Sequence, residues 1–466
     1  MLQRFRPDDP AFLGQLETRL AAALRRAGNL EQGLLSVTLA VPEIPFEHLP
    51  ASLDGMFYWC RPAARNNLLG LGAAAVIEAS GEGRWRHLRE GFDAWRWHWR
   101  HEDGDATGLR PLALGGFSFA PLDRATALPA ARLVVPALLL RRAGDTTALT
   151  FTFRAPDAGA GAARKTLRRL AAVLAKHPSF PVEGQPLTRH ACTPDDPAWL
   201  ARVGEAVADI QAGLLDKVVL SRRVTVSAPR AFDPARIMAD LARRNPRCTL
   251  FGLENGIGGT FLGASPELLA GLHNGEACCD ALAGTAWDQG GQYQGSQDRG
   301  EALLGDVKNG REHRLVVQAV AEALRPVCAR LEVPAAPVAL NLGSLLHLRS
   351  TLRGKVKAGI GLLDLLERLH PTPAVGGYPR PAALDWLARH GEARDDWYTG
   401  AVGWMDSAGE GEFAVALRCA RIHGNEAELY AGAGIVAGSD PARELAETEA
   451  KLAPMLHALA CGAGHG

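Results

Sequence analysis

YAGAGIVAGSDPARELAETEAKL, residues Tyr430 to Leu452, joins a glycine-rich segment directly to a predicted helix. Gly432, Gly434 and Gly438 carry no Cβ atom, so backbone N–H groups here can approach an anion closely. The next three residues, Ser439-Asp440-Pro441, are typical of a helix cap followed by a first helical turn. The stretch therefore predicts a glycine-rich turn that binds an anion at the start of a helix.

The helix that follows is expected to carry acidic residues on one face. Glu444, Glu447, Thr448 and Lys451 lie at positions i, i+3, i+4 and i+7, which share a face in helical geometry. Two carboxylates one turn apart can hold a divalent cation, and the lysine can contact an anionic ligand. The same spacing is common on solvated helices, where it forms weak ion pairs, so the spacing alone leaves both interpretations open.

Composition argues against several classes of protein. The chain has 466 residues, with 51 basic and 51 acidic side chains, and this balance gives no support for a nucleic acid or an anionic membrane as partner. The first residues lack a hydrophobic signal core, and the longest apolar runs are too short to span a bilayer, so we expect a cytoplasmic protein. Eight cysteines without a CxxC pair indicate neither a zinc site nor a disulfide framework.

Lysine is rare in this chain, since only seven of the 51 basic residues are lysines. Arginine keeps its proton, so each lysine is a candidate for a task that requires proton release. Lys217 lies in the strand-like run LDKVVLSRRVTV, whose apolar character predicts a partly buried amine that gives up its proton readily. The alternative is a lysine that protects a strand edge from aggregation.

Further polar residues interrupt apolar segments of the same half. Glu267 follows a proline in FLGASPELL, a setting that favours a protonated carboxyl group. ALAGTAW predicts a tight turn in which the backbone at Gly284 and the hydroxyl of Thr285 can contact a polar ligand. Glu312 follows Lys308 by four residues on a predicted helix, so it is either a third metal ligand or the partner of Lys308.

Three more residues are candidates on weaker grounds. His347 lies in the apolar run LLHLRSTLRG, where a lone histidine is more often a core residue than a catalyst. Tyr398 and Arg418 are polar groups on predicted strands, and either can bind a carboxylate, Arg418 in bidentate fashion. The segment HPTPAVGGYPRP, residues 370–381, predicts a rigid irregular loop of the kind that shapes pockets.

The pattern of elements predicts an α/β (α+β) protein with large antiparallel sheets flanked by helices. Many strand-like segments occur without the regular alternation that marks βαβ units. We expect residues 1–190 to form an N-terminal sheet-forming region that packs on the core, and residues 191–460 to form the catalytic region. Both are expected to belong to one structural unit.

Six segments together resemble the chorismate-utilising enzymes, the family of the isochorismate, salicylate, anthranilate and aminodeoxychorismate synthases. They are KVVLSR, FLGASPELL, LAGT, EHRLVV, HPTPAVGGYP and GAGIVAGSDPARELAETEAK, and they occur in the family's order between about residues 195 and 455. The N-terminal third matches more loosely, through FYW and GGFSF. The resemblance implies the fold of anthranilate synthase component I and chorismate as the substrate.

The resemblance also implies a set of site residues. Mg²⁺ would be held against the ring carboxylate of chorismate by three glutamates, Glu312, Glu444 and Glu447. Other matching positions would clamp the substrate carboxylates or line the ring site: Gly284, Thr285, His347, Tyr398, Arg418, Gly432, Gly434 and Lys451. Such a clamp holds a small dianion in one orientation.

A few positions distinguish the members of the family. Anthranilate synthases carry glutamine where this chain has Lys217, and aminodeoxychorismate synthases carry lysine where it has Ala283, so neither amination nor an obligatory glutamine amidotransferase subunit is expected. Lys217 as base and Glu267 as acid fit attack of water at ring C2 with loss of the C4 hydroxyl, which gives isochorismate. Salicylate synthase, which then eliminates pyruvate, and a non-catalytic chorismate-binding subunit stay open. The product would serve menaquinone, siderophore or salicylate synthesis.

Overall fold

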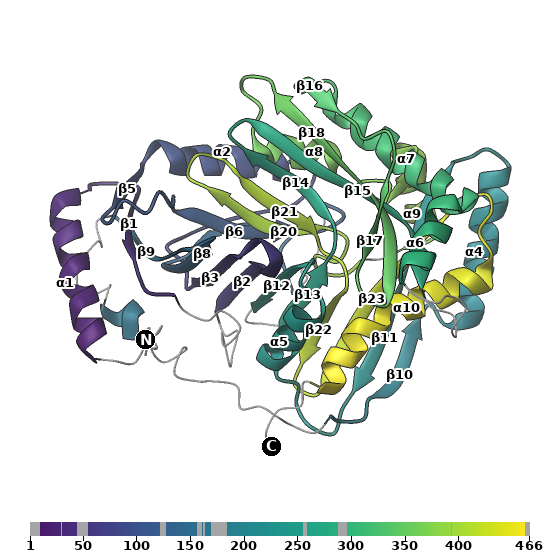
Figure 1. Ribbon diagram of the computed structural model, residues 1–466, viewed down its shortest axis with the longest axis horizontal. Coiled ribbons are helices and arrows are strands. Elements are labelled where there is room, and N and C mark those ends of the chain that lie inside the picture. The colour runs from purple at the N-terminus through teal and green to yellow at the C-terminus, as the bar shows by residue number, and fades with distance from the viewer. Residues whose placement is uncertain are drawn as a thin grey trace.

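One long sheet crosses the molecule in the computed structural model, which describes residues 10–28, 30–43, 55–121, 127–155, 161, 164–168, 184–254, 259–287, 296–392 and 394–461 (Figure 1). Its strand order is β10 (Thr188–Thr193), β11 (Lys217–Ser227), β23 (Glu426–Ile435), β22 (Cys419–His423), β13 (Thr260–Ser265), β12 (Thr249–Glu254), β2 (Met56–Arg61), β3 (Asn66–Leu71), β8 (Leu138–Ala143), β9 (Thr146–Arg154), β1 (Leu34–Ala40) and β5 (Trp99–Asp103). A short strand, β19 (Gly377–Tyr378), pairs with β11. The β1–β5 pairing is parallel and the other pairings along this order are antiparallel.

A second, antiparallel sheet packs against the first. Its order is β16 (Cys328–Glu332), β18 (Leu345–Val356), β15 (Glu276–Trp287), β14 (Leu268–His273), β21 (Gly411–Val415), β20 (Ala401–Asp406), β6 (Leu112–Phe117), β7 (Ala131–Val135) and β4 (Ala75–Ala79), and β17 (Val338–Asn341) pairs with β18. Trp59 of β2 and Trp404 of β20 meet edge to face between the sheets, with ring centroids 6.1 Å apart. Both sheets contain strands from before and after residue 190. The division of the chain into an N-terminal region, residues 1–190, and a catalytic region, residues 191–460, stays a prediction.

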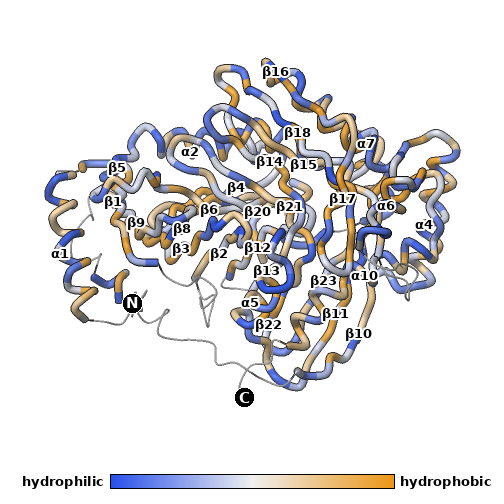
Figure 2. Tube along the Cα trace, viewed as in Figure 1, coloured by the Kyte–Doolittle hydropathy of each residue, from blue (hydrophilic) through white to orange (hydrophobic). Residues whose placement is uncertain are grey.

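Helices flank the two sheets (Figure 1). They are α1 (Pro10–Ala27), α2 (Arg84–Trp97), α4 (Asp196–Gln211), α5 (Pro234–Arg244), α6 (Ser296–Gly305), α7 (Val307–Leu324), α8 (Leu362–Leu369), α9 (Arg380–Arg389) and α10 (Pro441–Cys461), with a short 3₁₀ turn at Pro62–Ala64. Figure 2 shows mainly hydrophobic residues along β8 and β9 and alternating hydrophobic and hydrophilic residues along α1. Among the described helices we find none with the length and hydropathy that a membrane span requires. The expected fold of large antiparallel sheets flanked by helices is confirmed.

The first half of the segment from Tyr430 to Leu452 folds differently from the prediction. Instead of a turn from Tyr430 onward, β23 continues to Ile435, because it pairs in register with β11 along its whole length. The turn begins only at Val436, whose N–H donates to the hydroxyl of Ser439 at 3.1 Å. The predicted cap is confirmed, since the Asp440 carboxylate accepts from the N–H of Arg443 at 2.9 Å and α10 begins at the next residue after Asp440.

Candidate active site

A cavity lies where the two sheets meet α7 and α10. Most of the residues predicted for the site line it, namely Glu267, Gly284, Thr285, Glu312, His347, Tyr398, Arg418, Gly432, Gly434 and Lys451. Of the other three predicted residues, Lys217 and Glu447 contact the lining residues Glu312 and Lys451. Glu444 contacts Lys308, which does not line the cavity. The structure therefore brings together segments that are more than 200 positions apart in the chain.

Three buried carboxylates in this region each form an ion pair with a largely buried lysine. The Nζ–Oε1 distances are 2.8 Å for Lys217–Glu312, 2.7 Å for Lys308–Glu444 and 2.6 Å for Lys451–Glu447. A carboxylate removed from water is tolerated only when a partner compensates the lost hydration. The three lysine–glutamate pairs together therefore carry no net charge.

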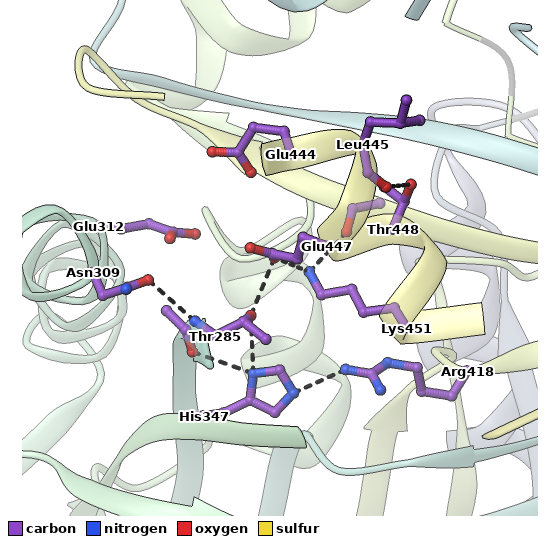
Figure 3. Close-up of polar contacts among 12 residues, drawn as sticks. Thr285, Asn309, Glu312, His347, Arg418, Glu444, Leu445, Glu447, Thr448 and Lys451 are labelled. Carbon is purple, nitrogen blue, oxygen red and sulfur yellow. Dashed lines mark hydrogen bonds and ion pairs between the residues drawn. The ribbon is translucent and has the colours of Figure 1, made fainter. Parts of the chain in front are cut away.

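The pairing of Glu312 differs from the one that sequence spacing suggests. Lys308, four residues earlier on α7, contacts Glu444 of α10, whereas Glu312 contacts Lys217 at the start of β11. The interpretation of Glu312 as the partner of Lys308 is therefore wrong. Figure 3 shows the carboxylates of Glu312 and Glu447 pointing toward one another from α7 and α10, with Glu444 one turn away.

Burial and neighbouring charges act on the three glutamates in different ways. Burial and the nearby charge of Glu447 raise the pKa of Glu444. Burial alone would also raise the pKa of Glu312, but Lys217 and Lys308 outweigh it and hold this pKa below its ordinary value. The pKa of Glu447 is lowered in the same way, against the effect of burial, by Lys451 and Lys308.

These carboxylates partly fit a hard divalent cation. Glu444 Oε2 is buried and has no hydrogen-bond partner, and oxygen ligands suit Mg²⁺. The three carboxylates do not form a closed cage, however, because the only set of three ligand atoms within 4.8 Å of one another among the described residues belongs to Asp240, His457 and Cys461. Two ligand oxygens of one Mg²⁺ lie at most about 4.2 Å apart, so the three glutamates as they stand do not all reach one ion directly, and at least one would have to hold it through a water molecule.

A directed chain of hydrogen bonds runs from Arg418 to Glu447 (Figure 3). Arg418 Nη2 lies 2.8 Å from His347 Nε2, and a guanidinium can only donate, so Nε2 accepts and the ring proton sits on Nδ1. Nδ1 lies 3.2 Å from both the Gly284 carbonyl and the Thr285 hydroxyl, and that hydroxyl donates to Glu447 at 3.1 Å. Burial and the charge of Arg418 hold the pKa of His347 well below its usual range. Neutral His347 thus connects the Arg418 cation to the Glu447 carboxylate through the hydroxyl of Thr285.

Glu267 has the environment that the sequence predicts. It lies between β13 and β14, is 2 % exposed, and its Oε1 has no hydrogen-bond partner. Burial, with a further contribution from the charge of Asp280, raises the pKa of Glu267 from 4.5 to about 8. This raised pKa agrees with the protonated carboxyl that the sequence predicts, and the role of Glu267 as an acid stays a prediction.

Tyr398 and Arg418 do not lie on strands, in contrast to the sequence prediction. Tyr398 lies in a turn before β20, and Arg418 lies between β21 and β22. The backbone explains the breaks, because Thr399 and Arg418 adopt φ values of +59° and +49°, which a strand does not accommodate. The ring of Tyr398 stacks on Tyr430 with centroids 5.0 Å apart, and burial raises the pKa of its hydroxyl, which therefore keeps its proton.

Sequence reasoning did not identify two residues that shape the cavity. Asn309 accepts from the N–H of Thr285 at 3.1 Å through its side-chain carbonyl. Arg394 is buried and donates to the carbonyls of Val219, at 2.7 Å, and Val375, so it ties the proline-rich loop to β11. Asn309 lies in KNGREH and Arg394 in RDDWY, and neither residue type signals its contacts in the sequence.

Comparisons with known proteins agree with this geometry. The family model described as chorismate binding enzyme matches residues 20–460. The chain is 36% identical over 420 residues to the salicylate biosynthesis isochorismate synthase of Pseudomonas aeruginosa, with 87% of this chain and 85% of that protein covered. It is 33% identical to the isochorismate synthase MenF of Bacillus subtilis, with 86% and 87% covered. The structure of MenF, the menaquinone-specific isochorismate synthase from Escherichia coli, superposes with a TM-score of 0.78 at 29% identity, covering 95% of this chain and 99% of that one.

Gly434 provides a test of how closely the Lys217–Glu312 pair is packed. A Cβ atom at this position would lie 2.3 Å from Glu312 Oε1 and 2.8 Å from Lys217 Cε. We expect Gly434→Ala to displace the pair and to lower the free energy of unfolding by about 1–3 kcal/mol, measured by urea denaturation. Gly438→Ala is the matched control, because its nearest neighbour would be Lys308 Cγ at 3.9 Å. Equal stability of the two variants would contradict this packing.

Glu267 provides a test based on pH. Its pKa is about 8 in the fold against an ordinary value of 4.5, so its contribution to stability is fully present below about pH 4.5 and is lost as pH rises through about 8. Because Gln does not titrate, we expect Glu267→Gln to gain several kcal/mol of stability relative to the wild type between about pH 5 and pH 8. Urea denaturation at both pH values measures the difference. The exposed Glu276→Gln is the control, and a pH-independent difference for Glu267→Gln would contradict the raised pKa.

Proposed function

Because the chain belongs to the chorismate-binding enzyme family, we propose that it is an isochorismate synthase, which converts chorismate into isochorismate. The single observation that carries this proposal is the buried cavity that combines a neutral acid, Glu267, with the cationic groups of Arg418 and Lys451. Such a site suits a small dianion whose hydroxyl group must leave as water. Two relatives with extensive coverage are named isochorismate synthases, which supports the same activity.

The clamp for the two substrate carboxylates is proposed to consist of Arg418, Lys451, Tyr398 and the backbone at Gly434. Arg418 offers two parallel N–H donors, and the Tyr398 hydroxyl keeps its proton and can donate. Lys451 is held in place by the Gly432 carbonyl at 2.8 Å and by Glu447. Gly284, Thr285 and His347 are proposed to line the ring site. Fixed donors of this kind hold the ring in one orientation for reaction.

Charge balance supports Mg²⁺ as the cofactor. The three lysine–glutamate pairs are neutral as a set and Arg418 adds one positive charge, so a dianion that enters the cavity leaves one negative charge uncompensated in a buried space. We propose that Glu312, Glu444 and Glu447 hold Mg²⁺, at least one of them through a bridging water, with water or substrate oxygens as the remaining ligands. When bound, Mg²⁺ would supply the compensating positive charge and orient the ring carboxylate of the substrate.

The acid and the base are proposed to be Glu267 and Lys217. Glu267 is protonated at neutral pH and can donate its proton to the departing C4 hydroxyl. Lys217 lies against Glu312 and Gly434, which both line the cavity. Its amine donates a hydrogen bond to Glu312 at 2.8 Å. As a base that accepts a proton from water, Lys217 must therefore leave Glu312 during the reaction.

The activity is tested by incubating the protein with chorismate and Mg²⁺ and separating the products by chromatography. We expect isochorismate from the wild type and a loss of turnover of about 100-fold or more from Lys217→Arg, because general base catalysis contributes about 10²–10⁴-fold and arginine does not give up its proton. Chorismate binding by Lys217→Arg, measured by calorimetry, is expected to persist. Lys355→Arg, at a lysine that contacts the Asn274 carbonyl outside the cavity, is the matched control.

The other outcomes distinguish the alternatives. Absence of isochorismate from the wild type contradicts the proposed activity. Pyruvate released in an amount equal to the product would indicate a salicylate synthase instead. A product that forms only with ammonia or glutamine would indicate amination chemistry and an amidotransferase partner. Full turnover by Lys217→Arg would remove Lys217 from the role of base.

A further inference from the structure

A second group of potential metal ligands lies outside the cavity, where α5 and α10 pack together. Asp240 of α5 and His457 and Cys461 of α10 each offer one ligand atom, and these three atoms all lie within 4.8 Å of one another. His457 and Cys461 are four residues apart on one helix and therefore share a face. None of the three belongs to the proposed active site.

The distance between the two ligand atoms on α10 matches a tetrahedral metal site. Cys461 Sγ and His457 Nε2 are 3.5 Å apart. In a tetrahedral site with bonds of about 2.3 Å to sulfur and about 2.0–2.1 Å to nitrogen, the two ligand atoms lie about 3.5 Å apart. The sulfur, nitrogen and oxygen ligands together suit Zn²⁺, whereas Mg²⁺ selects oxygen ligands.

The helices that carry the ligands are held in place by a hydrophobic core. Ile237 and Leu241 of α5 and Met455 and Leu459 of α10 are buried in the same apolar cluster. Ligands on packed helices keep their relative positions better than ligands on loops. His457 is exposed, so an ion can reach the site from solvent.

Asp240 already has two partners, Arg243 and Arg244 of the same helix. They contact its carboxylate at 2.6 and 3.0 Å, and their side chains are 67% and 44% exposed, whereas that of Asp240 is 10% exposed. An ion must therefore compete with two partly exposed arginines for a mostly buried carboxylate. A carboxylate has about four lone-pair positions, so Asp240 can bind an ion while one arginine stays in contact.

We propose that Asp240, His457 and Cys461 bind a divalent transition-metal ion of the Zn²⁺ class, with the fourth position open to water. No local pattern predicts such a site, since the chain contains no CxxC pair and Asp240 lies more than 200 positions before its two partners. The site needs the Cys461 thiolate, because the ligand must lose its proton to bind the ion.

The probe is Co²⁺, which replaces Zn²⁺ in such sites and gives a thiolate charge-transfer band in the near ultraviolet. The full-length protein is titrated with Co²⁺ in excess Mg²⁺, so that the glutamate cluster does not contribute. We expect the band to saturate at about one equivalent of Co²⁺, to be abolished in Cys461→Ser and in His457→Ala, and to disappear when Zn²⁺ is added.

Cys278→Ser, at a cysteine of β15 in the second sheet, is the matched control and is expected to keep the band. Thermal denaturation of each variant without metal checks that the fold is intact, and exposed His457 is replaced without loss of core packing. Zn²⁺ is expected to raise the melting temperature of the wild type and of Cys278→Ser only. No charge-transfer band in the wild type, or an unchanged band in Cys461→Ser, would overturn the proposal.

Discussion

The neutralisation of three buried glutamates by three lysines is the interaction on which the rest of the site depends. Each carboxylate has lost most of its hydration, and each pairs with one amine at 2.6–2.8 Å. Removing one partner of a buried pair leaves an uncompensated charge and costs about 3–5 kcal/mol. The pairs join β11, α7 and α10, so the same contacts that solvate the charges also fix the walls of the cavity.

The site places its carboxyl groups in different surroundings, which shift their pKa values in opposite directions. Glu312 and Glu447 have lysines close enough to outweigh burial, and their pKa values are lowered. The charges of Lys217 and Lys451 act to lower the pKa of Glu267, but burial and the charge of Asp280 outweigh them and raise this pKa to about 8. A neutral acid can therefore persist beside ionised carboxylates, and this separation supports the proposed role of Glu267 as proton donor.

Much of this architecture could be predicted from the sequence because local signals carry it. The order of the motifs and the many short strands gave the fold class, and Ser439-Asp440-Pro441 gave the start of α10. The rarity of lysine drew attention to Lys217, and three of the seven lysines belong to the cluster of ion pairs.

The remaining features depend on contacts between distant segments, which local patterns do not encode. The glycines of YAGAG predicted a turn, but pairing with β11 makes this segment a strand and leaves room at Gly434 for the Lys217–Glu312 pair. Lys308 pairs with Glu444 on another helix rather than with its neighbour Glu312. The buried position of Arg394 and its contacts with β11 and the proline-rich loop follow only from the tertiary structure.

We expect the cavity, whose three ion pairs are neutral and whose Arg418 adds one positive charge, to hold a dianion only together with a compensating cation. Calorimetric titration of chorismate into the protein, with and without Mg²⁺, measures this dependence. Mg²⁺ is expected to tighten chorismate binding by about tenfold or more, and chorismate to tighten Mg²⁺ binding by the same factor, because linked binding is reciprocal. Equal chorismate affinity with and without Mg²⁺ would contradict it.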